Sequence, residues 1–341
     1  MLLWLPAVLP CLLLEHGNLP ETMTIGVDIG GTKVAAGLVD GAGAITAKTR
    51  APMISTGDAA TGFSGVRAAV EAVFAAEPGA RGAVAGIGIC APGPLDPASG
   101  VVLNPPNLPC WRNFPLADEI ERAFGIPAHV DNDANAAALA EVLWGAAQGY
   151  RYVFYATLGT GIGSGIVLDG RIYHGRTGSA AEGGHIVIDY NGPLCGCGKR
   201  GCIEALCSGT AIARRAQEKL ATAGAAGRRL IELAGGAAAA VKTEHVGQAW
   251  REGDPLAGGV LRETARLLTI WLGNVVDILD PDVLVVGGGM AELMSGLFPE
   301  ILADLPQWAI NPRVREIPLV MARYGADAGI AGAAALVNAA R

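Results

Sequence analysis

Apolar and polar positions alternate along this chain in short runs that are separated by glycine-rich breaks. Residues 24–40 form two apolar runs around a turn at residues 28–33 (DIGGTK), and residues 153–173 repeat this pattern around a second glycine-rich turn (TLGTGIG). Two apolar runs joined by a short glycine turn predict a β-hairpin. The recurrence of strand, glycine turn and strand indicates that the chain contains two related halves.

Longer segments between and after these hairpins have the spacing of apolar residues that is typical of helices. Buried strands are predicted within residues 83–96, 128–134 and 282–290. Strands that alternate with helices in this way predict an α/β protein. The expected helices cover residues 58–76, 116–124 (ended by Gly125 and Pro127), 134–147, 208–222, 228–240, 256–279 and 325–340.

Composition limits the classes of protein that this pattern allows. A chain of 341 residues suits two domains rather than one compact core. Hydrophobic residues make up 51%, many of them alanine, which suits close helix packing in a soluble α/β protein. A net charge of −7 argues against nucleic acid as a general partner, because phosphate binding requires a basic surface. No basic amphipathic stretch indicates a membrane partner either.

The first 14 residues (MLLWLPAVLPCLLL) are apolar but too short to span a bilayer, and they contain two prolines. No Lys or Arg precedes them and no A-x-A cleavage site follows, so they match a signal peptide poorly. A well-patterned strand begins at Thr24. We therefore expect residues 1–22 to be a non-native or disordered extension before a start at Met23, with a degenerate export signal as the alternative.

The two glycine turns are candidates for phosphate binding. Glycine lets backbone N–H groups approach a phosphate, and threonine adds a hydroxyl donor. Asp28 at the first turn is placed to hold Mg²⁺, although a plain hairpin explains the same residues. The second turn matches neither a Walker A loop nor a Rossmann fingerprint, since a strand follows it. A third glycine cluster, Gly287-Gly288-Gly289, ends a buried strand, which is a usual place for nucleotide contact.

Asn132-Asp133-Ala134-Asn135 lies where a predicted strand gives way to a helix. Asn and Asp are favoured helix N-caps, so capping is one explanation of these residues. Two asparagines beside an aspartate at the end of a strand also suit recognition of sugar hydroxyls by the amides and proton abstraction by the carboxylate. Both interpretations stay open on the residues alone.

His185, Cys195, Cys197 and Cys202 have the spacing of a zinc site. One imidazole and three thiolates form the closed tetrahedral site of a structural Zn²⁺, and no open position is left for catalysis. Clustered cysteines indicate metal binding in a reducing compartment rather than disulfides. Glu182 and Glu204 flank the cluster, which would fix their carboxylates in space. Cys207, Cys90 and Cys110 are expected to be packing residues.

Taken together, these motifs resemble the ROK (repressor, open reading frame, kinase) family of sugar kinases. That family has E-x-G-H followed by C-x-C-G-x-x-G-C-x-E, and this chain has Glu182-Gly183-Gly184-His185 followed by residues 195–204 (CGCGKRGCIE). The D-x-G-G-T, N-D-A-N and G-T-G-x-G elements occur in the family's order. The resemblance covers about residues 24–337.

The resemblance implies an actin-like ATPase (ribonuclease H-like) fold, with two α/β domains and the active site in a cleft between them. It assigns residues 23–131 plus 326–341 to a small N-terminal domain, and residues 132–325 to a large C-terminal domain with the zinc loop. Asp133 would be the catalytic base, and His185 would bind both zinc and sugar. The sugar-binding residues would be Gly93, Asn107, Asn132, Asp133, Glu182, His185 and Glu204. Those that bind ATP and Mg²⁺ would be Asp28, Gly30, Gly31, Thr32, Lys33, Thr157, Gly159, Thr160, Gly161, Gly287, Gly288 and Gly289.

The implied reaction is ATP-dependent phosphorylation of a hexose. Residues 104–111 (NPPNLPCW) resemble a segment of the glucokinase-like members, so D-glucose is preferred over N-acetylmannosamine, N-acetylglucosamine and fructose. A cytoplasmic homodimer or homotetramer is the family expectation. Without a helix-turn-helix segment before Met23, DNA binding of the repressor type is not expected. The rival interpretations are a sugar sensor without turnover and an actin-like ATPase with a protein client.

Overall fold

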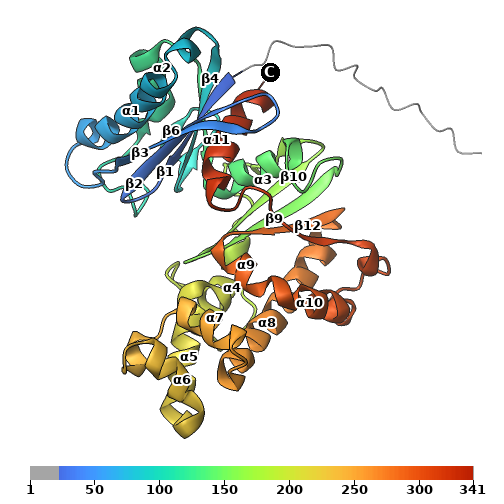
Figure 1. Ribbon diagram of the computed structural model, residues 1–341. Helices are drawn as coiled ribbons and strands as arrows, with labels where there is room; N and C mark the ends of the chain where they lie inside the picture. The colour runs from blue at the N-terminus through green and yellow to red at the C-terminus, as the bar shows by residue number, and fades with distance from the viewer. Residues whose placement is uncertain (1–22, 341) are drawn as a thin grey trace, which may run out of the picture.

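The computed structural model describes residues 23–340, and it contains two five-stranded sheets, each covered by helices (Figure 1). The expectations for residues 1–22 lie outside the described residues. The first sheet has the order β3-β2-β1-β4-β8. Its strands are β1 (Met23–Ile29), β2 (Lys33–Val39), β3 (Ile45–Pro52), β4 (Val84–Ala91) and β8 (Ala128–Asn132). A small three-stranded sheet lies beside it, made of β5 (Leu95–Asp96), β6 (Val101–Val102) and β7 (Phe114–Pro115).

The second sheet has the order β11-β10-β9-β12-β13. In both sheets the first three strands of the half are antiparallel neighbours, and the last two run parallel to the first strand. The two halves thus share one topology, which confirms the duplication that the glycine turns predict. The strands of the second sheet are β9 (Tyr152–Leu158), β10 (Ile162–Leu168), β11 (Arg171–Ile172), β12 (Val283–Gly287) and β13 (Leu319–Met321).

Helices cover the two faces of the first sheet in different ways. On one face, α1 (Ala59–Ala76) and α2 (Leu116–Phe124) enclose an apolar core that includes Ile25 and Val27. Asp58, which the sequence placed inside the helix, caps α1 by accepting the Thr61 N–H at 2.7 Å. Gly125 ends α2 in the left-handed conformation, at the position where the sequence predicts its end. On the other face lies α11 (Ala328–Ala339), the last helix of the chain (Figure 1).

Two helices rich in small residues lie between the sheets. The helix α3 (Asp133–Leu143) packs on β9 and β10 and also against α11. A Cβ atom at Gly332 of α11 would come within 2.6 Å of the backbone of Ala136 and Ala137 in α3, so the two helix backbones nearly touch. This is the alanine-lined packing that the composition suggests. The helix expected at residues 134–147 ends at Leu143. Just beyond it, the Glu141 side chain accepts the Ala146 N–H, which holds the chain in a turn.

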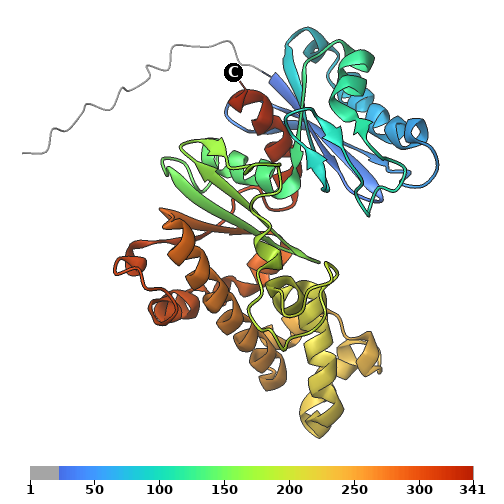
Figure 2. The same ribbon diagram turned by 180° about the vertical axis from the view of Figure 1, so that it is seen from behind.

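The second half carries additional helices that extend away from its sheet (Figures 1 and 2). Their apolar core forms around α8 (Pro255–Leu279), and the Trp271 side chain of this helix is buried in it. The helix predicted at 228–240 is wrong beyond Leu233, because Gly235 and Gly236 adopt positive φ angles that break it. These helices are α4 (Ile203–Cys207), α5 (Gly209–Ala223), α6 (Arg228–Leu233), α7 (Thr243–Arg251), α8 (Pro255–Leu279), α9 (Gly289–Met294) and α10 (Phe298–Asp304).

None of the helices between residues 23 and 340 combines the length and apolar character that crossing a membrane requires. For the domain division we propose the boundaries expected from the sequence, residues 23–131 plus 326–341 and residues 132–325. The first sheet with α11 falls in one unit, and the second sheet with its helices falls in the other.

Candidate active site

The first glycine turn joins β1 to β2 and lies against the loop that carries Asn107. The Gly30 N–H donates to the Lys33 carbonyl at 2.9 Å, which closes the turn. A Cβ atom at Gly31 would lie 3.2 Å from the Asn107 carbonyl oxygen. Thr32 and the Lys33 side chain remain exposed to solvent. The structure therefore brings the predicted phosphate turn and Asn107 together.

Asp28 lies in β1 just before this turn, and its carboxyl packs against the first residues of α11. A Cβ atom at Gly329 would come within 2.4 Å of the Asp28 carboxyl carbon, so only glycine fits there. The Cys90 thiol donates to Asp28 Oδ1 at 3.6 Å. Burial raises the pKa of the Asp28 carboxyl, while the Cys90 hydrogen bond and the charge of Lys33 act in the opposite direction. A partly buried carboxylate at this place suits a divalent cation.

Asp133 is the first residue of α3, and Asn132 is its N-cap. The Asn132 Oδ1 atom accepts the Ala134 N–H at 2.9 Å, which assigns the capping role to the asparagine. Asp133 Oδ1 also accepts this N–H, at 2.8 Å. The carboxyl of Asp133 reaches solvent, so it is accessible to a substrate. Capping alone therefore does not account for the aspartate.

The charge environment of Asp133 places three acidic residues near one another. Desolvation raises the pKa of the Asp133 carboxyl, and the negative charges of Asp28 and Glu182 raise it further. Asp28 comes from the first sheet, whereas Glu182 follows the second hairpin. Negative charges from both halves therefore act on the carboxyl at the N-terminus of α3. Gly93 borders the same place, since a Cβ atom there would lie 3.9 Å from the Asn132 side-chain nitrogen.

The second glycine turn joins β9 to β10 and is braced by α5. The Gly159 N–H donates to the Gly161 carbonyl at 2.9 Å, and the Gly209 N–H donates to the Gly159 carbonyl at 2.8 Å. The Thr210 hydroxyl donates to the Thr160 carbonyl at 3.2 Å. The N-terminus of α5 therefore fixes the turn, and Thr157 is the second-last residue of the strand that precedes it.

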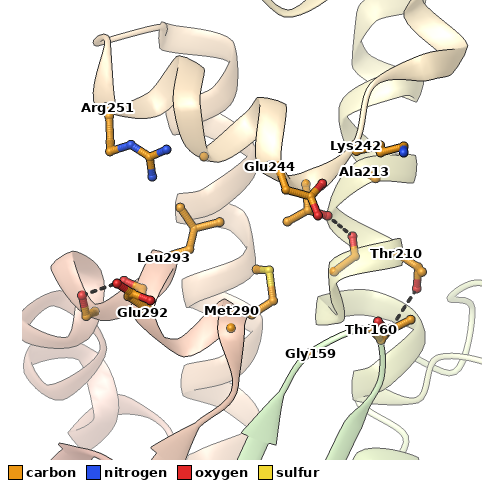
Figure 3. Close-up of a pocket in the computed structure, with 15 residues that line it drawn as sticks. Gly159, Thr160, Thr210, Ala213, Lys242, Glu244, Arg251, Met290, Glu292 and Leu293 are labelled. Carbon is orange, nitrogen blue, oxygen red and sulfur yellow. Dashed lines mark hydrogen bonds between the residues drawn. The ribbon is translucent and has the colours of Figure 1, made fainter. Parts of the chain in front are cut away.

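Next to this turn lies a cavity of about 1060 Å³, large enough for a nucleotide (Figure 3). Its walls come from the turn, α5, α7 and α9, and combine apolar side chains with charged ones at the edge. Several wall residues were not predicted, because α7 carries no recognisable motif. The lining comprises Gly159, Thr160, Gly209, Thr210, Ala213, Lys242, Thr243, Glu244, Gly247, Arg251, Gly289, Met290, Glu292, Leu293 and Ser295.

The three glycines at the end of β12 and the start of α9 have different surroundings. Gly289 lines the cavity. Gly287 is enclosed, because a Cβ atom there would lie 2.8 Å from the Tyr155 hydroxyl. Gly288 has a φ angle of 86° and packs against the Leu158 carbonyl, which leaves no room for a side chain. Only Gly289 borders the space in which a nucleotide would lie, and the other two allow the chain to pass close to β9.

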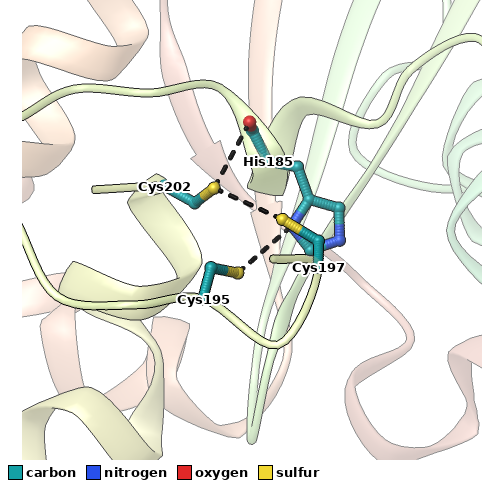
Figure 4. A group of neighbouring side chains, drawn as sticks. All are labelled: His185, Cys195, Cys197 and Cys202. Carbon is teal, nitrogen blue, oxygen red and sulfur yellow. Dashed lines mark hydrogen bonds between the residues drawn. The ribbon is translucent and has the colours of Figure 1, made fainter. Parts of the chain in front are cut away.

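His185, Cys195, Cys197 and Cys202 form one group, with all four ligand atoms within 4.8 Å of one another (Figure 4). The Cys195 sulfur is 3.6 Å from His185 Nδ1, and the sulfur atoms of Cys197 and Cys202 are 3.6 Å apart. Zinc binds thiolates at about 2.3 Å, so two sulfurs on a tetrahedron lie about 3.8 Å apart. The cluster fits a zinc ion, and the second ring nitrogen of His185 points away from the cysteines (Figure 4).

Glu204 connects this cluster to the second glycine turn. Its Oε2 atom accepts the Ile162 N–H at 2.9 Å, and its Oε1 atom lies 4.0 Å from His185 Nδ1. Glu182 is exposed and immediately precedes the 3₁₀ turn Gly183–His185. Glu204 is therefore fixed beside the Cys/His cluster, whereas Glu182 adjoins the cluster only through the chain that leads to His185.

Two α/β halves of one topology, each with a glycine turn, define a two-domain protein of the actin-like ATPase type. The ROK family profile matches residues 24–340, and the chain belongs to the ROK family. The family and fold expected from the sequence are confirmed.

Three known proteins illustrate the similarity. A glucokinase of Streptomyces coelicolor is 36% identical over 319 residues, which are 93% of this chain and 98% of that protein. An N-acetylmannosamine kinase of Salmonella typhi is 33% identical over 315 residues, 92% and 98% of the two chains. The crystal structure of a ROK family glucokinase from Streptomyces griseus in complex with glucose and AMPPNP is similar with a TM-score of 0.77. It is 37% identical, and the match covers 92% of this chain and 98% of that one.

Proposed function

We propose that this chain is an ATP-dependent hexokinase that transfers the γ-phosphoryl group of ATP to the 6-hydroxyl of D-glucose. The observation that carries the proposal is the position of Asp133 at the N-terminus of α3, where the negative charges of Asp28 and Glu182 act on its carboxyl. Two glycine turns lie in the same halves as these carboxylates. Similarity to glucokinases over nearly the whole chain supports glucose as the acceptor.

Asp133 takes the proton from the attacking sugar hydroxyl in this proposal. A carboxyl with a raised pKa is a stronger base than an ordinary aspartate, provided that it is ionised at the working pH. The N-terminus of α3 favours its ionised form. The sugar would be held by Gly93, Asn107, Asn132, Glu182, His185 and Glu204, with His185 using the nitrogen that points away from the cysteines.

The nucleotide would occupy the cavity beside the second turn, with its phosphates directed towards both glycine turns. Phosphoryl transfer depends mainly on positioning and charge neutralisation, which backbone N–H groups and Mg²⁺ supply. Asp28 would hold the Mg²⁺ ion. The predicted phosphate contacts are Gly30, Gly31, Thr32, Lys33, Thr157, Gly159, Thr160 and Gly161, and Gly289 would border the adenosine.

Zinc would be the resident ion of the cluster formed by His185 and the three cysteines. Its chemistry is structural, because four protein ligands complete a tetrahedron. The ion would hold His185 and Glu204 in fixed positions beside the sugar. We also propose a cytoplasmic location, which suits reduced thiolates. A homodimer or homotetramer stays a prediction.

A panel of hexoses tests the function. We expect ADP release to require a sugar, and kcat/KM to be highest for glucose among glucose, N-acetylmannosamine, N-acetylglucosamine, mannose and fructose. The same panel with polyphosphate as donor tests the role of ATP. A higher kcat/KM for another hexose would overturn the choice of glucose. Sugar binding without ADP release for every hexose would favour the sugar sensor.

A further inference from the structure

The two faces of the strand β10 contact different parts of the molecule. Its glycines face α3, since a Cβ atom at Gly165 would come within 2.7 Å of the Ala134 carbonyl oxygen. Ser164 lies between these glycines, and successive residues of a strand point to opposite faces. Its side chain is only 5% exposed and points to the segment that carries Glu182.

The Ser164 hydroxyl bonds the backbone on both sides of Glu182. It donates to the Ala181 carbonyl at 2.6 Å and accepts the Gly183 N–H at 2.9 Å. Among residues 23–340, no other side chain hydrogen-bonds to the Ala181 carbonyl or to the Gly183 N–H. These two bonds use the only donor hydrogen of the hydroxyl and one of its two lone pairs. Glu182 is therefore held by its neighbours, while its own side chain stays exposed.

The backbone held by Ser164 has an unusual conformation. Ala181 has a φ angle of 63°, a region that residues with a Cβ atom rarely occupy. The turn that follows is pressed onto β10, because a Cβ atom at Gly184 would come within 1.9 Å of the Ile162 carbonyl oxygen. From the other side, the Trp271 indole donates to the Gly183 carbonyl at 3.1 Å. Specific contacts therefore maintain a backbone that would otherwise relax.

The same strand also holds the second glutamate. Ile162 lies two residues before Ser164, and its N–H donates to Glu204. Ile162 is the first residue of β10 after the second glycine turn. One strand thus joins the turn proposed to bind phosphate to both glutamates proposed to bind sugar.

We propose that Ser164 is a positioning residue for the sugar site, and that its hydroxyl sets the direction of Glu182 and His185 relative to the second phosphate turn. This inference rests on the proposed function, in which Glu182 and His185 bind the sugar. Without the hydroxyl, the Ala181 carbonyl and the Gly183 N–H lose their partner in a buried place. Ala181 then leaves the left-handed region, and Glu182 moves with it.

The test compares Ser164→Ala with Thr269→Val. Thr269 is also buried, and its hydroxyl bonds only the Ala265 carbonyl within α8, so both variants lose one buried hydroxyl. We expect Ser164→Ala to raise the KM for glucose about tenfold or more, with the KM for ATP within about twofold of the parent value. Calorimetric titration should show the same loss of glucose affinity. Thr269→Val should change neither KM.

Two further variants make the result decisive. Ser164→Cys keeps a weaker hydrogen-bonding group of similar shape, so an intermediate KM for glucose is expected even if the alanine variant folds poorly. Ala181→Gly in the Ser164→Ala background should recover part of the affinity, because glycine adopts positive φ angles readily. Zinc content should equal that of the parent in every variant.

Glu182→Gln separates failure of this inference from failure of the proposed function. A higher KM for glucose in Glu182→Gln together with an unchanged KM in Ser164→Ala would overturn the positioning role alone. An unchanged KM in both variants would overturn the sugar-binding role of Glu182, and the positioning role with it. Equal changes in the KM values for glucose and ATP would show that Ser164 supports the fold in general.

Discussion

The two halves of the molecule share a strand order but differ at the residue that precedes each glycine turn. Asp28 and Thr157 occupy equivalent places, since each is the second-last residue of the first strand in its sheet. The first half therefore presents a carboxylate and the second a hydroxyl. The turns also differ in support: α5 and Glu204 bind the second turn, whereas the first accepts the Met53 N–H and lies against the loop that carries Asn107. The same strand and turn thus present a negatively charged group in the first half and neutral hydrogen-bond donors in the second.

The largest effect should come from Asp133→Asn, which removes the proposed base at the start of α3. We expect kcat to fall by about a thousandfold, a typical contribution of general base catalysis. Glucose affinity, measured by calorimetry, should change little, because the amide keeps the shape of the side chain. Retention of more than a few per cent of kcat would contradict the base assignment. In the parent enzyme, the raised pKa of Asp133 predicts that activity declines on the acid side at a pH above the ordinary aspartate value of 3.8.

Replacing Cys197 by Ser tests whether a zinc ion bound by the Cys/His cluster stabilises the second half. We expect loss of zinc and a decrease in unfolding free energy on the order of 3 kcal/mol, since metal binding stabilises such loops directly. Glucose affinity should fall as His185 and Glu204 lose their fixed positions. Cys207→Ala is the matched control, because this buried thiol lies outside the cluster and bonds the Thr264 carbonyl. A zinc content equal to the parent value in Cys197→Ser would refute the ligand set.

Asp28→Asn and Thr157→Val separate the tasks of the two turns. For Asp28→Asn we expect the Mg²⁺ concentration at half-maximal activity to rise about tenfold, because a neutral amide binds the cation more weakly. For Thr157→Val we expect the KM for ATP to rise by a smaller factor, with the Mg²⁺ requirement unchanged. Steady-state titrations of Mg²⁺ and ATP give both quantities. If the two variants change the same parameter by the same factor, the halves are not specialised.

The smallest effect concerns an ion pair that joins the halves. His174, which follows β11, lies 2.6 Å from the buried carboxylate of Asp131 in β8, and this contact raises the pKa of the imidazole above 6.5. A raised pKa in the folded state means that the stabilisation is complete below 6.5 and disappears as the pH rises through the higher value. His129 and Arg171 line the same small cavity.

The measurement for this pair is thermal denaturation of the parent and of His174→Gln. At about pH 6 the parent should be more stable, by less than about 1 kcal/mol because His174 is partly exposed. At about pH 9 the difference should become smaller. A difference that grows with pH would show that the imidazole acts in its neutral form.

Much of this arrangement follows from local sequence, and the remainder depends on contacts between distant segments. Glycine turns between apolar runs predict both hairpins, and the spacing of one histidine and three cysteines predicts their cluster. The choice between Asn132 and Asp133 as the cap needs the structure, because both residue types cap helices well. The wall of the nucleotide cavity contributed by α7 has no motif, so Lys242 and Arg251 could not be predicted. Ser164 has no local signal either, since its partners lie 17 and 19 residues away.

The near-contact of α3 with α11 has a consequence for movement. The close approach at Gly332 joins the two helices, and Leu139, Ile330 and Leu336 belong to the same buried cluster, so a movement of one helix is felt by the other. Asp133 begins α3, and Asp28 lies at the beginning of α11. Sliding at this contact therefore changes the separation of the two carboxylates directly. The packing of α3 on α11 therefore sets the distance between the proposed base and the proposed cation ligand.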